Sequence, residues 1–248
     1  MTVVIWSQDM LPRSLTATIA SAAALLTSHA FAAAPRPVVV ELFTSQGCSS
    51  CPPADRFLSE LSDSRTDVLP LAFHVTYWNQ LGWKDPFSFE GADARQARYA
   101  QRFRDFEYTP EMVIDGKAEV VGSNHIAASA AIDHARSAGV TAATVLATRV
   151  DSGVSVSIGP GTGHAHVLLV GYDARHVTAI GRGENAGHTL TESNVVRSIV
   201  AIGQWSGTAL MLRADAVAGE HQVVLLEDND GAIVGAARVV DTSEAPAR

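Results

Sequence analysis

Two cysteines, Cys48 and Cys51, have the residue type and spacing that most directly point to chemistry in this chain. They are its only cysteines, and Ser49 and Ser50 separate them. Such a pair can be half of a zinc site, a structural disulfide, or a dithiol that is oxidised and reduced in turn. A structural zinc site needs four ligands, and no second Cys-x-x-Cys is present. A disulfide across so short a loop stabilises little, because it hardly restricts the unfolded chain. The pattern therefore favours redox chemistry.

The segment around the cysteines predicts a strand, a turn and a helix. The β-branched apolar run 37–43 is typical of a buried strand, and the apolar spacing within 52–63 is helical. This places Cys48 near the helix start and Cys51 in its first turn, followed by two prolines where a helix tolerates them. Unpaired amides and the helix dipole would stabilise a thiolate on Cys48. Cys48 is therefore the predicted nucleophile, and Cys51 is the cysteine that resolves the mixed disulfide.

Further elements follow in the order strand, helix, two strands and helix. They are predicted at residues 68–78, 90–103, 110–116, 117–123 and 123–138. The two short strands share an Asp115-Gly116 turn, a strong hairpin signature, and Ser123 or Asn124 is expected to cap the last helix. From about residue 141 the pattern changes to short β-branched or alternating runs separated by Gly, Asp and Asn. That pattern predicts a β-sandwich of roughly eight strands.

The order of the first seven elements resembles that of thioredoxin, and Thr109-Pro110 stands where thioredoxin-like proteins carry a cis-proline facing the dithiol. Several segments resemble a bacterial family of exported thioredoxin-like proteins catalogued as domain of unknown function 1223. The matching segments are 39–55, 74–87, 95–100, 108–123 and 181–199. The resemblance implies a fold and no substrate. The expected fold class is an α/β thioredoxin-like N-terminal domain plus a C-terminal all-β sandwich-like domain, the latter docking on the former to select partners.

The resemblance also implies roles for individual residues. A cis peptide at Thr109-Pro110 would line the groove in which the substrate backbone docks. The family's second strand usually reads His-Val-Asp-Tyr-Trp-Asp, whereas Thr76 and Asn79 replace the two acids here. The resemblance therefore assigns no carboxylate role to these two positions.

Several other side chains are candidates for the site. Glu41, within an apolar strand, is either a general base for Cys51, like the buried acid of thioredoxins, or an acid bonded to nearby amides. Trp78 and Trp83, together with Phe87, are expected either to form a substrate wall beside the cysteines or to anchor their loop. His74 is either a satisfied core residue or, if it approaches the dithiol, a metal ligand or a group that shifts the pKa of the cysteines.

Two further sequence patterns are better explained by a structural role than by a binding or catalytic role. His164 and His166 alternate on one strand face as a metal pair would, but nothing nearby in the sequence completes a site. The arginines between Arg95 and Arg104 have helical spacing and are predicted to form a solvated face.

The ends of the chain and its charge indicate an exported protein. Residues 1–32 have the positive start, apolar run and small-x-small ending of a signal peptide, with Met10 as a second candidate start. The predicted domains are a thioredoxin-like domain at 33–139 and a sandwich-like domain at 140–241, followed by a tail at 242–248. A formal charge of −8 disfavours nucleic acid and anionic membranes as partners. We expect no membrane span in the mature chain and a periplasmic or secreted location.

Three functions are compatible with these residues. The first is a thiol-disulfide oxidoreductase without a cofactor, whose Cys48 and Cys51 exchange with protein or small-thiol disulfides and with a separate redox partner. The second is a binder of Cu(I) or another thiophilic metal through Cys48, Cys51 and His74. The third is a non-catalytic interaction module with a static disulfide. The first best accounts for the position of the pair at a helix start.

Overall fold

The structure is a computed structural model that describes residues 36–139 and 141–241. The predicted signal peptide, 1–32, and the predicted tail, 242–248, lie outside the described residues. These described residues belong to one compact unit, Ala33–Arg248. None of the helices in the described part of the chain is long and apolar enough to cross a membrane.

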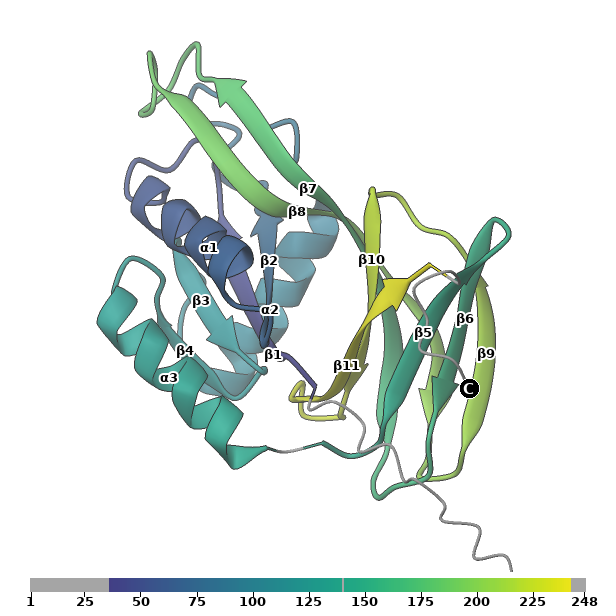
Figure 1. The fold of residues 1–248 in the computed structure, drawn as a ribbon. Coiled ribbons are helices and arrows are strands. Elements are labelled where there is room, and N and C mark those ends of the chain that lie inside the picture. The colour runs from purple at the N-terminus through teal and green to yellow at the C-terminus, as the bar shows by residue number, and fades with distance from the viewer. Residues whose placement is uncertain (1–35, 140, 242–248) are drawn as a thin grey trace, which may run out of the picture. The chain divides into compact units, whose positions relative to one another are not determined.

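The first half of the described chain carries four strands and three helices (Figure 1). They are β1 (Val38–Thr44), α1 (Pro52–Ser64), β2 (Val68–His74), α2 (Glu90–Phe103), β3 (Glu111–Ile114), β4 (Ala118–Val121) and α3 (His125–Ala138). The three predicted helices are confirmed, and local chemistry accounts for the starts of α1 and α3. Two prolines occupy the first positions of α1, and the Asn124 side chain accepts a hydrogen bond of 3.2 Å from the Ala127 amide at the start of α3.

The predicted hairpin turn is also confirmed. Residues 115–117 connect β3 to β4, and Asp115 and Gly116 have φ values of 49° and 63°. Both values lie in the left-handed region, which Asp and Gly accept more readily than most residues. The turn therefore fixes the register in which β3 and β4 pair.

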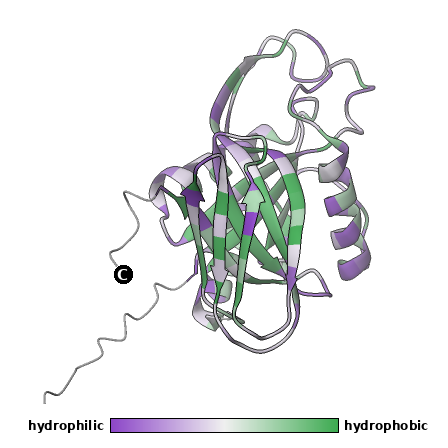
Figure 2. Ribbon diagram, turned by 90° about the vertical axis from the view of Figure 1, so that its right-hand side faces the viewer, coloured by the Kyte–Doolittle hydropathy of each residue, from purple (hydrophilic) through white to green (hydrophobic). Residues whose placement is uncertain are grey.

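The second half of the described chain consists of strands. They are β5 (Val145–Val150), β6 (Gly153–Ile158), β7 (Ala165–Ala179), β8 (Thr189–Trp205), β9 (Leu210–Asp215), β10 (His221–Glu227) and β11 (Ile233–Val240). Apolar residues line these strands (Figure 2). The two longest, β7 and β8, form an antiparallel hairpin that extends beyond the other strands of this half (Figure 1).

The predicted fold class, a thioredoxin-like α/β domain plus a separate β-sandwich, is wrong. The strands of both halves form one mixed sheet of eleven strands, in the order β4-β3-β1-β2-β8-β7-β10-β11-β5-β6-β9. The junction is a parallel pairing of β2 with β8 through Ala72 and Val195. Because β2 has β1 on its other side, the strands of the second half continue the sheet of the first.

The misread strands explain part of this error. Residues 164–173 and 177–182 suggest two strands, because polar residues separate their apolar runs. In the structure these residues contribute to the single strand β7, and Arg175 between the runs pairs with Ser193 of β8. This outer part of the hairpin is largely exposed, so its residues lack the continuous apolar pattern that marks a buried strand.

Both faces of the central strands are covered by apolar side chains. On one face of β1, Val40 and Leu42 pack with residues of α1 and α3. On the other face, Val39 and Phe43 pack with residues of α2, β7 and β10. A third apolar cluster lies between β7 and β10 on one side and β5 and β6 on the other. The strands β7 and β10 therefore contribute alternate residues to two cores.

A buried ion network ties the two halves together. Arg95 of α2 donates hydrogen bonds to Glu41 of β1 and, over 2.6 Å, to Glu227 of β10. Burial alone would lower the pKa of Arg95, but the Glu41 charge helps to hold it well above its ordinary value. The prediction of a solvated arginine face is therefore wrong for Arg95, whose side chain is 2% exposed, although the Arg98 side chain is 59% exposed.

Candidate functional site

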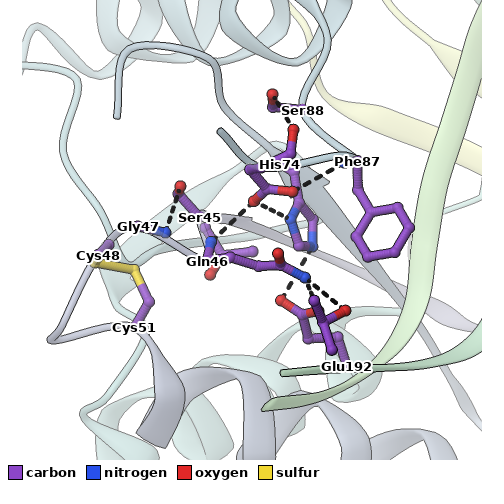
Figure 3. A network of polar contacts seen from close by, with 12 residues as sticks. Ser45, Gln46, Gly47, Cys48, Cys51, His74, Phe87, Ser88 and Glu192 are labelled. Carbon is purple, nitrogen blue, oxygen red and sulfur yellow. Dashed lines mark hydrogen bonds and ion pairs between the residues drawn. A yellow bond between two sulfur atoms is a disulfide. The ribbon is translucent and has the colours of Figure 1, made fainter. Parts of the chain in front are cut away.

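Cys48 and Cys51 form a disulfide in the turn between β1 and α1 (Figure 3). Cys51 is the N-cap of α1, so the helix begins one residue after it. Both cysteines are fully buried, whereas Ser49 and Ser50 between them are exposed. The Cys48 sulfur lies 3.3 Å from the Ser50 hydroxyl oxygen. The helix start and this hydroxyl both favour a thiolate once the bond is reduced.

The loop at the end of the β7–β8 hairpin, residues 180–188 and here called the tip, is hydrogen-bonded to the cysteine turn. Asn185 donates from its side-chain nitrogen to the carbonyl oxygens of Gln46 and Cys48, each over 2.9 Å. Glu184 accepts hydrogen bonds from the Ser49 amide at 3.1 Å and the Ser49 hydroxyl at 2.7 Å. The second half of the chain therefore contributes directly to the surroundings of the disulfide.

Gln46, two residues before Cys48, links the turn to the structure below it (Figure 3). Its backbone amide donates to the carboxylate of Asp85 over 2.8 Å. Its side-chain nitrogen donates to Glu192 of β8 over 2.7 Å, and its side-chain oxygen accepts a 3.0 Å bond from the Trp83 indole. All functional groups of this buried glutamine are thus engaged, and they hold the cysteine turn in place.

His74, at the end of β2, lies between two carboxylates. Its Nδ1 is 2.8 Å from Asp85, and its Nε2 is 3.8 Å from Glu192 (Figure 3). Burial opposes a charged imidazole, but the charge and hydrogen bond of Asp85, together with Glu192, raise the pKa of His74 to about 9. Burial alone would raise the pKa of Asp85. The charge and the hydrogen bond of His74, with backbone hydrogen bonds, lower it, so that the net shift is downward. His74 and Asp85 therefore form a buried ion pair.

Two further buried acids complete the group, and burial raises the pKa of both. Asp55 lies four residues after Cys51 on α1 and accepts a 2.7 Å hydrogen bond from Thr44. Burial and then the Glu192 charge raise the pKa of Asp55 to about 7. Burial also raises the pKa of Glu192, against the opposing charge of His74. We call Asp55, His74, Asp85 and Glu192 the buried acid cluster.

Three atoms of this cluster make no hydrogen bond within the described residues. They are Oδ2 of Asp55, Nε2 of His74 and Oε1 of Glu192. Two of these atoms, Nε2 of His74 and Oε1 of Glu192, lie 3.8 Å apart. Unpaired buried polar atoms are rare, and a catalytic role is one of the explanations for them.

Glu41 lies on the opposite face of β1 from the apolar side chains that pack on α1. Its carboxylate accepts bonds from the Arg95 guanidinium and the Tyr99 hydroxyl. Its nearest partners are thus cationic or neutral side chains of α2. The role of general base for Cys51 stays a prediction for Glu41, and Asp55 stands closer in the chain to that cysteine, one helical turn after it.

The structure brings Trp78 and Thr109 to the cysteine turn. The Trp78 indole donates a 2.8 Å hydrogen bond to the Thr109 hydroxyl. A Cβ placed on Gly47 would lie 3.2 Å from the Cβ of Trp78, so Trp78 packs directly against the residue preceding Cys48. The Thr109-Pro110 peptide is cis, as the resemblance implies.

Pro110 is buried next to the start of α1. A Cβ on Gly122 would lie 3.1 Å from the Cβ of Ala54 and 3.3 Å from that of Pro110. Trp83 packs against the tip, because a Cβ on Gly183 would lie 3.1 Å from its Cβ. Trp78 and Trp83 thus lie beside the cysteine turn, and Thr109 is bonded to Trp78, while a substrate groove at these residues stays a prediction.

The residues of the alternative metal sites are not drawn together. Within the described residues, no group of three or more His, Cys, Asp or Glu is arranged to hold a metal ion. His74 directs its two nitrogens to Asp85 and Glu192. His164 and His166 line two different cavities, away from the cysteine turn.

Sequence reasoning missed the contributions of Asp55, Asp85, Glu192 and Asn185. Asp55 offered one signal: it stands where an acid follows Cys51 by one helical turn. Asn185 and Glu192 offered none, because they lie in a segment whose separation from the cysteines exceeds a hundred residues.

The raised pKa of Asp55 predicts how stability depends on pH. Between pH 3.8 and about 7 the folded protein keeps a proton on Asp55 that the unfolded chain releases, so this group makes folding less favourable as pH rises through that window. Asp55→Asn removes this cost while keeping an oxygen for Thr44. We expect it to increase the free energy of unfolding above pH 7 by up to about 4 kcal/mol, and to change it little near pH 4.

Urea unfolding of both proteins from pH 4 to 8 checks this expectation. Glu60→Gln is the matched control, because Glu60 is an exposed acid on the same helix. A variant whose gain in stability does not grow with pH would show that Asp55 is ionised in the fold.

The chain is therefore a protein with one mixed β-sheet and a buried disulfide, and the turn that carries the disulfide is bonded to the tip of a hairpin. The family described as "Protein of unknown function (DUF1223)" matches residues 39–234, and the chain belongs to that family. No curated protein matches it.

Two solved structures are similar. The crystal structure of protein AGR_C_4864 from Agrobacterium tumefaciens has a TM-score of 0.72 and 29% sequence identity, over 85% of this chain and 96% of that one. HBP35 of Porphyromonas gingivalis has a TM-score of 0.54 and 12% identity, over 86% of this chain and 79% of that one. At that identity the second likeness shows the fold alone.

Proposed function

We propose that this protein is a thiol-disulfide oxidoreductase that exchanges disulfides through Cys48 and Cys51. The observation that carries the proposal is the disulfide itself, formed by the two cysteines at the start of α1. A bond across such a short loop adds little stability, so a structural role accounts poorly for it. The buried acid cluster nearby supports the same conclusion, since reduction of a disulfide to two thiols consumes two protons.

The proposed reaction transfers two electrons between sulfur atoms. A substrate thiolate attacks the Cys48 sulfur, the Cys48–Cys51 bond breaks, and Cys51 leaves as a thiolate. The second thiolate of the substrate then attacks the substrate sulfur of this mixed disulfide and releases Cys48 as a thiolate. The substrate ends as a disulfide and the protein as a dithiol. The reverse sequence reduces a substrate disulfide, and no organic cofactor takes part.

Asp55 is the proposed proton donor to Cys51. The two residues are four apart on α1, so their side chains lie on the same side of the helix. With a pKa of about 7, Asp55 carries a proton in a large fraction of molecules at neutral pH. It can give this proton to the departing thiolate and regain one from the side of Glu192 and His74. In the reverse direction Asp55 accepts the proton of Cys51.

The proposal includes an exported location. The predicted signal peptide at 1–32 supports it, as does the use of only two cysteines as a pair, because disulfides persist in oxidising compartments such as the periplasm. The separate redox partner of the exchange would work in the same compartment.

A redox titration of the purified protein tests the function. The protein is equilibrated in glutathione buffers, free Cys48 and Cys51 are alkylated, and the masses of the products are measured. We expect a reduction potential between about −120 and −270 mV, the range of exchanging catalysts. A value near the upper limit would identify a donor of disulfides, and one near the lower limit a reductant.

The outcome that rejects the function is equally definite. A pair that stays oxidised below about −300 mV, or that does not exchange at all, is a static structural bond. The protein would then be an interaction module in which the disulfide only shapes the turn.

A further inference from the structure

We propose that the tip, residues 180–188, is a cover that a substrate polypeptide displaces, and that the substrate takes over the hydrogen bonds of Asn185. This inference rests on the proposed exchange function and deepens it, because it selects polypeptides over small thiols as substrates.

The need for displacement follows from burial. Cys48 and Cys51 both have no exposed surface. An attacking thiolate must approach a disulfide sulfur directly, so exchange requires that a covering group moves away. The tip bonds to the cysteine turn itself, through Asn185 and Glu184, and we infer that it is the group that moves.

The tip is built so that it can move as a unit. The Ile180 amide donates to the His188 carbonyl, and the Gly187 amide donates to the Ile180 carbonyl, each over 2.8 Å. These bonds stay intact if the whole loop shifts. Of its four hydrogen bonds to the turn, the two made by Glu184 are exposed to water. Exposed bonds of this kind are exchanged for water at little cost.

The hydrogen bonds of Asn185 indicate which molecule can replace the tip. Asn185 donates to two buried carbonyl oxygens, those of Gln46 and Cys48. When the tip leaves, both oxygens lose a donor, which is costly unless the incoming molecule supplies one. Backbone N–H groups of an extended polypeptide are suitable donors, as in other modes of peptide recognition. Dithiothreitol has two hydroxyl groups that can donate hydrogen bonds, but it has no backbone and cannot pair with the turn as an extended polypeptide does.

Two substitutions open the tip independently. Asn185→Ala removes both bonds to the turn. Gly183→Ala introduces a side chain at a residue whose φ is +79° and whose Cβ would lie 3.1 Å from the Trp83 Cβ, so it pushes the tip away from Trp83. Arg182→Ala is the matched control, because Arg182 is an exposed residue of the same loop.

The test is the rate at which the disulfide is reduced in each protein. Dithiothreitol serves as the small dithiol and reduced, unfolded ribonuclease as the polypeptide dithiol, with rates normalised to the thiolate concentration. We expect Asn185→Ala to accelerate reduction by dithiothreitol about tenfold, the effect of losing two modest hydrogen bonds, and Arg182→Ala to leave it unchanged. Reduction by the polypeptide should accelerate less, so the preference for polypeptide should fall.

Reoxidation by oxidised dithiothreitol separates a cover from an electronic effect. If the tip only controls access, both directions accelerate equally and the reduction potential stays the same. Rates within twofold of wild type in Asn185→Ala and in Gly183→Ala would overturn the inference. The inference would also be overturned if Asn185→Ala changed the reduction potential and altered only one of the two rates, reduction or reoxidation. Asn185 would then stabilise one redox state of the disulfide and not act as part of a cover. These comparisons between variants and wild type do not depend on whether the reduction potential lies between about −120 and −270 mV. The redox titration therefore tests the proposed function separately from the role of the tip.

Discussion

Cys48→Ser is expected to abolish thiol-disulfide exchange, with a fall in rate of at least about three orders of magnitude, the loss seen when a catalytic nucleophile is removed. The physical reason is that no sulfur remains at the position where the mixed disulfide forms. Reduction of a disulfide-containing peptide, followed by the appearance of free thiols, measures the rate. The fold should survive, because the bond closes a loop of only a few residues.

Cys51→Ser provides the matched comparison. This variant keeps the proposed nucleophile and lacks the resolving thiol, so it should accumulate a mixed disulfide that is visible as an added mass on Cys48. If the mixed disulfide formed on Cys51 in Cys48→Ser instead, the assignment of the two cysteines would be reversed. Equal activity in both variants and the wild type would reject the exchange reaction.

Arg95→Met is expected to lower the free energy of unfolding by about 3–5 kcal/mol, the cost of breaking a buried ion network on one side. The substitution leaves the carboxylates of Glu41 and Glu227 buried without their cation. Urea unfolding measures the change. Exchange activity of the folded variant should be retained, because the network lies on the face of β1 away from α1.

Arg98→Ala is the control for this prediction. Arg98 lies on the same helix, and its side chain is 59% exposed and 3.6 Å from Glu227. An exposed pair of this kind contributes at most about 1 kcal/mol. If Arg95→Met also lowered the free energy of unfolding by less than about 1 kcal/mol, protonation or water would be stabilising Glu41 and Glu227 in place of Arg95. The network would then contribute little to holding the two halves together.

Local features were predictable because they depend on neighbouring residues. The prolines mark the start of α1, Asn124 caps α3, and Asp115-Gly116 closes a hairpin, so these elements follow from short stretches of sequence. The cysteine pair and the cis peptide before Pro110 were likewise found from motifs.

The sheet and the site were less predictable because they depend on distant pairs. No short stretch shows that Ala72 will pair with Val195, and this pairing turns two expected domains into one sheet. The position of Glu41 in an apolar strand showed only that a buried acid needs a partner. That partner, Arg95, could not be recognised, because its helical spacing with other arginines is typical of an exposed face. The apolar pattern of a strand indicates which of its own residues are buried. Which other strand it pairs with depends on the whole fold.

The contact between Gln46 and Glu192 spans 146 residues, and this separation sets an order of events during synthesis. The cysteine turn is made early, while β8 and the tip emerge only after most of the chain has been produced. Contacts of such long range form late in folding, because the loop between them must first be closed. If the disulfide forms before these late contacts, it forms without the tip beside it.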